Sequence, residues 1–125
     1  VNVGLFCSTP SVPVSRNLGR KQAMELLLTG HFIDAHTALQ WGLVNRVVPA
    51  SRLDQEVAEL AGSIMSKSWV AVATGKRMFY KQLELPLESA YDYASGVMAG
   101  NMMADDVEEG VDAFMQKRTP VWKHQ

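Results

Sequence analysis

The fold is decided by residues 26–49, which read LLLTGHFIDAHTALQWGLVNRVVP. The leucine-rich start of this stretch stops at Gly30, and glycine commonly closes a helix in the left-handed conformation. It therefore predicts a helix over 22–29. Asp34 has a side chain suited to an N-cap, which predicts a second helix over 35–41 that Gly42 ends.

Three short segments around this stretch have the apolar, β-branched composition of strands, namely residues 1–7, 31–33 and 44–48. Such short strands cannot make a stable sheet by themselves. We therefore expect sequence ahead of Val1, which is not an initiator methionine, to supply the remaining strands. Pro10 and Pro13 mark a loop after the first strand, and Pro13 could open a short helix.

The rest of the sequence predicts longer helices over 53–64, 68–83 and 87–102, and a last one from Asp105 to the Thr119-Pro120 stop. Glu108 and Glu109 follow the start of the last helix at a spacing close to that of a capping box. The apolar stripes exceed what a short chain can cover. We expect them to pack on each other, on sequence outside this chain or on a neighbouring chain.

Composition limits the class of protein. The chain has 125 residues, of which 47% are hydrophobic and 20% charged, with a net charge of −1. This indicates a packed domain or part of one. Residues 23–29 and 35–42 could suggest a helix-turn-helix, but the 12 basic residues are balanced by 13 acidic ones, which argues against nucleic-acid binding. No apolar run reaches the ~20 residues of a membrane span, and one cysteine cannot form an internal disulfide.

The residues by themselves show no catalytic constellation. We interpret His31, His36 and His124 as surface or loop histidines rather than metal ligands. Cys7 has no basic neighbour in sequence to activate it, so a buried structural thiol is the favoured interpretation. Each acidic residue has a structural or solvated position. Lys117-Arg118, at a helix C-terminus, has a structural explanation there, and such a basic end could also bind a phosphate.

Residues 26–49 resemble the crotonase (enoyl-CoA hydratase/isomerase) superfamily, in which this region reads (L/F)TG-x-x-(I/L)-x-A-x-x-A-x-x-x-G-L-V-x-x-V-V-P. Residues 3–10, 79–83 and 113–124 are similar to one branch of it. The resemblance implies the C-terminal portion of an α/β, crotonase-like (ClpP/crotonase) fold, mostly helical with a few short strands. Residues 1–50 would end the ββα core, and residues 51–125 would form a helical trimerisation region.

The resemblance also implies a chemistry. A thioester enolate is held by two backbone N–H groups, and two glutamates handle water and proton in hydratases. All of these groups would lie ahead of Val1, so we expect the isolated chain to be inactive. The implied function is the C-terminal part of an enoyl-CoA hydratase-like, acyl-CoA-processing enzyme. The alternative is a non-catalytic acyl-CoA-binding or assembly protein of the same fold.

The implied partners are an acyl-CoA substrate and further copies of the chain in a trimer or hexamer, with no separate cofactor, nucleic acid or membrane span. The compartment would be cytoplasmic in a bacterium and mitochondrial in a eukaryote.

Three substrate-binding positions carry over from the family. Lys117 matches a lysine that approaches the CoA nucleotide, and Met98 matches an aromatic residue that packs on the adenine. Methionine could pack there without stacking. Ser8 stands where hydratases have a turn glycine and dienoyl-CoA isomerases an aspartate, which disfavours isomerase activity. Residues 7–11 also depart from the hydratase turn Pro-Gly-x-Gly-Gly, so the acyl pocket would differ.

Overall fold

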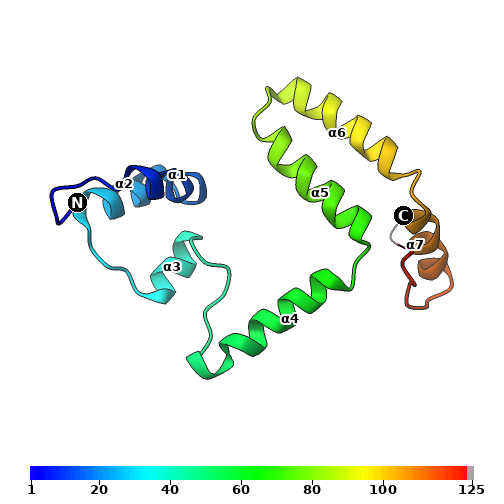
Figure 1. Cartoon of the computed structure of the whole chain (residues 1–125), viewed down its shortest axis with the longest axis horizontal. Coiled ribbons are helices and arrows are strands. Elements are labelled where there is room, and N and C mark those ends of the chain that lie inside the picture. Colours follow the sequence, from blue (N-terminus) through cyan, green and yellow to red (C-terminus); the bar gives the residue numbers. More distant parts are fainter. Residues whose placement is uncertain (124–125) are drawn as a thin grey trace. The chain divides into compact units, whose positions relative to one another are not determined.

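The computed structural model describes residues 1–123, and its regular elements are all helices (Figure 1). In chain order they are α1 (Ser8–Asn17), α2 (Arg20–Thr29), α3 (Ala35–Trp41), the short 3-10 helix η1 (Ala50–Arg52), α4 (Leu53–Met65), α5 (Trp69–Gln82), α6 (Leu87–Asn101) and α7 (Asp105–Met115). The chain divides into two compact units, Val1–Leu53 and Asp54–Gln125. The roles predicted for residues 1–50 and 51–125 stay predictions.

In the first unit, α2 and α3 form where the sequence predicts helices. Gly30 and Gly42 close them with φ angles of 63° and 82°, the left-handed region that glycine tolerates. The Asp34 carboxylate accepts a 2.8 Å hydrogen bond from the Thr37 backbone N–H and so caps α3. This hydrogen bond holds the pKa of Asp34 below its usual range. These ends were predictable because each depends on one local residue.

The loop predicted around Pro10 is wrong, because α1 begins at Ser8. The short helix that Pro13 could open is present, but Pro13 lies inside it and not at its first position. Pro10 is in the first turn, where a backbone N–H has no helical partner in any case. Pro13 lies inside the helix and removes one hydrogen bond from it. Helix α1 packs against α2, and Leu18, just after α1, is buried. Tertiary contacts thus outweigh the local proline signal.

The predicted strands are also wrong within residues 1–123, where the structure has no β-strand. Residues 1–7 contain a turn closed by a 2.9 Å bond from the Gly4 N–H to the Val1 carbonyl, and residues 31–33 and 44–48 are irregular. A strand exists only through pairing with another strand. The described residues provide no such partner, so this part of the expected α/β character is not confirmed.

In the second unit, α5 and α6 pack against each other. The predicted helices over 53–64, 68–83 and 87–102 correspond to α4, α5 and α6. Ser68 caps α5, since its hydroxyl oxygen accepts a 3.3 Å hydrogen bond from the Ala71 N–H. The predicted capping box at α7 is wrong: the N-cap is Ala104, which has no side-chain acceptor. The acidic side chains of that first turn make other contacts, described below.

The described residues leave much of their apolar surface open. The buried apolar residues are small, apart from one leucine: Leu18, Ala23, Ala38, Ala90 and Ala113. Large side chains along α6 and α7 are exposed, including Leu87 (75%), Met98 (64%) and Phe114 (82%). The apolar stripes predicted from the sequence are therefore present, and residues 1–123 do not cover them. No described helix is long and apolar enough to cross a membrane.

Candidate functional site

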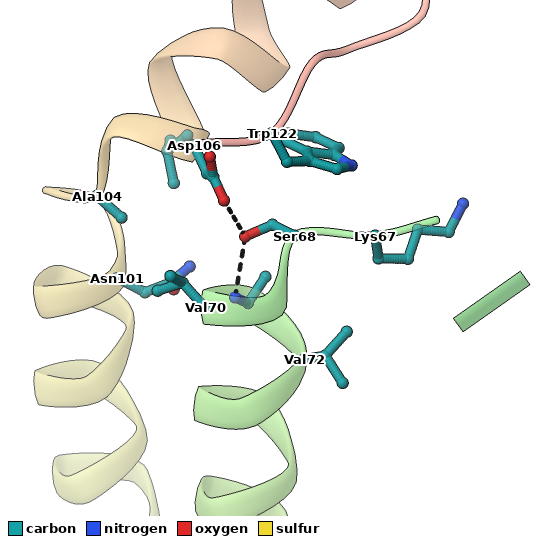
Figure 2. A pocket seen from close by; sticks show the side chains of 10 residues that line it. Lys67, Ser68, Val70, Val72, Asn101, Ala104, Asp106 and Trp122 are labelled. Atoms are coloured by element: carbon teal, nitrogen blue, oxygen red, sulfur yellow. Dashed lines mark hydrogen bonds between the residues drawn. The ribbon is translucent and has the colours of Figure 1, made fainter. Parts of the chain in front are cut away.

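A buried carboxylate lies at the junction of α5 and α7. Asp106 is 4% exposed, and its Oδ2 accepts a 2.5 Å hydrogen bond from the Ser68 hydroxyl (Figure 2). Its Oδ1 accepts a 2.7 Å hydrogen bond from the backbone N–H of Lys123. Burial of a carboxylate requires such partners. Asp106 thus joins the start of α5, the first turn of α7 and the C-terminal tail, which we define as residues 118–123.

A hollow of about 420 Å³ adjoins this junction. It is mostly apolar, and Ser68, Asp106, Asn101 and Trp122 are among its lining residues (Figure 2). The indole N–H of Trp122 donates a 2.8 Å hydrogen bond to the Ser66 carbonyl, which fixes the ring beside the hollow. Among the described residues, the Asn101 Oδ1 is a buried acceptor without a hydrogen-bond partner.

Met98 lines a second, smaller hollow of about 240 Å³ between α5 and α6. Gly75, Met78 and Val97 are among its other walls, and Asn101 is shared with the first hollow. The Met98 side chain is 64% exposed, so it can present its flexible thioether at the surface. Met98 therefore occupies a surface position where an apolar ring could pack.

Lys117 lies in a tight turn after α7, which we call the Lys117 turn (residues 116–118). Its φ is 54°, the one positive φ of a non-glycine residue within the described part of the chain. The Lys117 N–H donates to the Phe114 carbonyl at 3.2 Å, and the Arg118 N–H donates to the Ala113 carbonyl at 3.0 Å. This is the Schellman pattern of helix ends, in which glycine is the usual left-handed residue. A lysine there costs about 1–2 kcal/mol of backbone strain.

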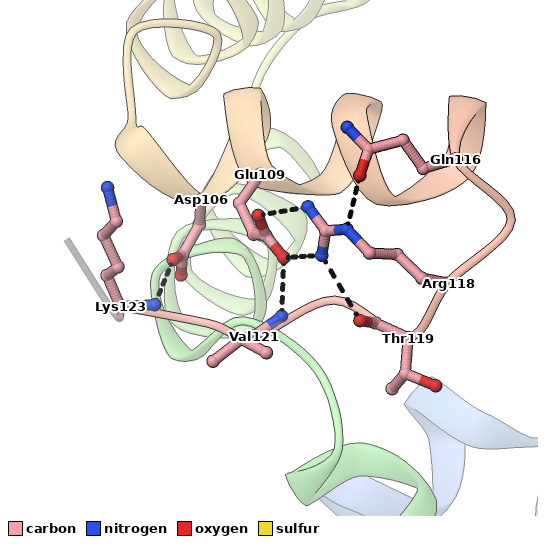
Figure 3. A network of polar contacts seen from close by, with 7 residues as sticks. All are labelled: Asp106, Glu109, Gln116, Arg118, Thr119, Val121 and Lys123. Atoms are coloured by element: carbon pink, nitrogen blue, oxygen red, sulfur yellow. Dashed lines mark hydrogen bonds and ion pairs between the residues drawn. The ribbon is translucent and has the colours of Figure 1, made fainter.

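Arg118 and Glu109 form the polar network that follows the turn (Figure 3). The guanidinium donates two parallel hydrogen bonds to the carboxylate, 2.5 Å from Nη1 to Oε1 and 2.9 Å from Nη2 to Oε2. Its Nε donates to the Gln116 Oε1 at 2.8 Å. A bidentate pair of this kind is stronger and more directional than a single contact.

Glu109 also binds the tail directly, because its Oε1 accepts a 2.7 Å hydrogen bond from the Val121 N–H (Figure 3). The hydrogen bond from Arg118, followed by that from Val121, lowers the pKa of Glu109 from 4.5 to about 2. The ion pair raises the pKa of Arg118 in turn. Glu109 is therefore ionised at neutral pH and neutralises Arg118.

The two neighbouring cations consequently differ in what they can bind. The Arg118 guanidinium is committed to Glu109, whereas Lys117 is exposed and, within residues 1–123, has no ion-pair partner. An exposed ammonium on a backbone fixed by hydrogen bonds can bind an anionic group such as a phosphate. The candidate site is thus the Lys117 turn.

The three sequence-predicted site residues lie on separate elements. Lys117 and Met98 are both in the second unit, but Lys117 does not line the hollow that contains Met98. Ser8 is the exposed first residue of α1 in the first unit, and its hydroxyl donates a 3.4 Å hydrogen bond to the Phe6 carbonyl.

The remaining candidates have ordinary surroundings. Cys7 is exposed within residues 1–123, so the prediction that its thiol is buried is wrong there. His31 and His36 are exposed, and His124 lies outside the described residues. Residues 1–123 contain no group of three or more His, Cys, Asp or Glu side chains placed to hold a metal ion.

Sequence reasoning missed Asp106 and Glu109 as anchors of the tail. It interpreted both as charges that favour the start of a helix. Their spacing of three residues places them on one face of α7, which was the available signal. That signal does not identify the bonded groups, because the backbone N–H groups of Val121 and Lys123 have no signature in sequence.

Comparison with known proteins identifies the family. A family model described as enoyl-CoA hydratase/isomerase matches residues 1–125. The chain is 50% identical over 124 residues to the mitochondrial enoyl-CoA hydratase domain-containing protein 3 of Rattus norvegicus, covering 99% of this chain and 41% of that protein. It is 48% identical over 125 residues to the Homo sapiens protein of the same name, covering 100% and 41%. The chain thus spans 41% of the length of these relatives.

Solved structures agree with this assignment. An enoyl-CoA hydratase of Mycobacterium smegmatis superimposes with a TM-score of 0.93 at 53% identity, covering 97% of this chain and 47% of that one. The human enoyl-CoA hydratase domain-containing protein 3 gives a TM-score of 0.92 at 48% identity, covering 97% and 48%. The predicted resemblance is confirmed, including the branch indicated by residues 3–10, 79–83 and 113–124. This chain belongs to the enoyl-CoA hydratase/isomerase family, the crotonases.

Proposed function

We propose that this chain forms the C-terminal part of an acyl-CoA-processing enzyme with enoyl-CoA hydratase-like activity. The observation that carries the proposal is the family match over residues 1–125. The Lys117 turn supports it, because an exposed ammonium held on a fixed backbone suits the anionic nucleotide of a CoA thioester. The substrate is then an acyl-CoA, with no separate cofactor.

The proposed chemistry divides between this chain and the sequence ahead of it. Two backbone N–H groups would stabilise the thioester enolate, and each such donor contributes about 3–4 kcal/mol in the transition state. Two glutamates would activate the attacking water and transfer the proton. These groups would precede Val1, whereas Lys117 would bind the nucleotide, Met98 would pack on the adenine and Ser8 would border the acyl pocket.

Hydration of crotonyl-CoA tests this proposal. The protein in its full length is expected to hydrate crotonyl-CoA, and the purified 125-residue chain at equal concentration is expected to show no turnover. The matched control is the full-length protein assayed without substrate. Turnover by the 125-residue chain alone, or none by the full-length protein, would contradict the proposal.

A second candidate is a non-catalytic acyl-CoA-binding or assembly protein of the same fold. The observation that favours it is the stretch around Ser8, which departs from the hydratase turn and forms the start of α1. The residues immediately preceding Val1 discriminate between the candidates. A glutamate aligned with the second hydratase glutamate supports hydration, and a neutral residue supports the non-catalytic candidate.

We also infer that copies of this protein associate with one another, and that its cellular compartment depends on its source. The exposed apolar side chains from Leu87 to Phe114 support assembly into a trimer or hexamer. The names of the vertebrate relatives include the word mitochondrial, which supports a mitochondrial location if the source is a eukaryote. A bacterial source would place the protein in the cytoplasm.

A further inference from the structure

The Lys117 turn needs support from outside itself. A lysine in the left-handed region is disfavoured relative to glycine, so the turn persists only where its surroundings hold it. Two backbone hydrogen bonds to α7 close it on one side. On the other side the chain continues directly into Arg118 and the tail, which are anchored to α7 through side chains.

Glu109 is the residue that provides this anchor on both sides of Pro120. Its two oxygens bind the guanidinium of Arg118 in a bidentate pair, and Oε1 also accepts from the Val121 N–H at 2.7 Å (Figure 3). The Arg118 Nη1 additionally contacts the Thr119 carbonyl at 3.4 Å. The segment after Lys117 is thus folded back onto α7 by one carboxylate.

The same carboxylate decides which cation is available to a ligand. Arg118 and Lys117 are adjacent, and a free guanidinium would compete with the ammonium for a phosphate. Pairing with Glu109 commits Arg118 to a structural role and leaves Lys117 exposed.

We propose that Glu109 is a positioning residue for CoA binding: by pairing with Arg118 and the Val121 N–H, it holds the Lys117 turn so that the Lys117 ammonium meets the nucleotide. This inference rests on the proposed role of Lys117. Glu109 itself does not touch the ligand. Its negative charge, taken alone, repels an anion, so a charge effect would make the removal of Glu109 strengthen CoA binding. A positioning role predicts that the same change weakens CoA binding.

The test is a double-mutant cycle on the full-length protein, with the dissociation constant of CoA measured by titration calorimetry. Lys117→Ala is expected to weaken binding about five- to 150-fold, and Glu109→Ala about fivefold. In the Lys117→Ala background, Glu109→Ala is expected to cause no further loss of affinity, and the released Arg118 guanidinium and the removed negative charge are expected to leave binding unchanged or improved. A defect that is only structural would instead weaken binding by the same factor in both backgrounds.

Glu108→Ala is the matched control, because it removes the same charge from the same turn of α7 at an exposed position. It is expected to leave CoA affinity unchanged or slightly improved. Glu109→Gln keeps the side-chain size and serves as the second variant should Glu109→Ala fail to fold.

Each outcome has a distinct meaning. Unchanged binding by Lys117→Ala overturns the proposed role of Lys117 and this inference with it. Weakened binding by Lys117→Ala, together with parental or improved binding by both Glu109 variants, overturns the inference about Glu109 alone. Additive losses in the cycle overturn it as well.

Discussion

The Ser68 hydroxyl and the Asp106 carboxylate, 38 residues apart in sequence, form a 2.5 Å hydrogen bond in a buried setting. The same hydroxyl oxygen accepts from the Ala71 N–H and so caps α5. One side chain therefore fixes the start of α5 and also attaches α7 to it. The second oxygen of Asp106 fixes the tail through the Lys123 N–H.

Asp106→Ala is expected to lower the free energy of unfolding by about 2–3 kcal/mol, because it leaves the buried Ser68 hydroxyl and the partly buried Lys123 N–H without their charged acceptor. Chemical denaturation of the full-length protein measures this loss. The matched control is Asp105→Ala, whose side chain is 55% exposed and lies 3.8 Å from the Lys123 ammonium. Its expected effect is within about 0.5 kcal/mol. Equal effects of the two substitutions would contradict the anchoring role.

Glu109 predicts a pH dependence of stability. Its pKa is about 2 in the folded chain against an ordinary 4.5, so the unfolded state binds more protons between these values. The stabilisation is complete above pH 4.5 and is lost as the pH falls toward 2. Denaturation midpoints across this range are expected to fall more steeply for the parent than for Glu109→Gln. Parallel curves would show that Glu109 contributes nothing to the acid transition.

The left-handed backbone of Lys117 predicts a separation of stability from binding. Lys117→Gly relieves the strain and is expected to raise the free energy of unfolding by about 1 kcal/mol. Lys117→Ala keeps the strain and is expected to leave stability near that of the parent. Both substitutions remove the ammonium, so both are expected to weaken CoA binding by about 1–3 kcal/mol. A glycine variant that is less stable than the alanine variant would contradict the strain at this position.

The exposed stripe on α6 and α7 predicts self-association. Sedimentation velocity of the full-length protein at micromolar concentration is expected to show a trimer or hexamer. Phe114→Glu places a charge at a side chain that is 82% exposed here, and it is expected to shift the population toward monomer. A well-folded monomer as the only species of the parent would show that the stripe is not an oligomer contact.

Local signals in the sequence were sufficient for most helices. Asp34, Ser68 and the two closing glycines each act on neighbours within four residues, and each end lies at or near its predicted place. The strands were not predictable from these residues because strand pairing is a long-range property. The start of α1 was misplaced for a related reason: the sequence allowed a short helix from Pro13, whereas α1 begins at Ser8 and packs on α2, which the local sequence does not reveal.

The residues alone indicated the basic end at Lys117 and Arg118, and the choice of Lys117 depended on family resemblance. Composition identified Lys117 and Arg118 as a basic pair but could not separate their roles. Their roles differ because Glu109, nine residues before Arg118, pairs with Arg118 and not with Lys117. This pairing requires the tail to fold back onto α7, and no sequence motif indicates that. Lysine at a position that favours glycine was the remaining local anomaly, and it becomes visible only when the end of α7 is known.

The fastening of the tail has a consequence for how this region can change over evolution. Glu109 and Asp106 bind the backbone N–H groups of Val121 and Lys123, so we expect substitutions of those two side chains to be tolerated. Proline is the exception, because it has no N–H to offer. Trp122 donates through its own indole N–H, so we expect substitutions there to be tolerated least. Among homologues we therefore expect positions 121 and 123 to vary more than the tryptophan at position 122.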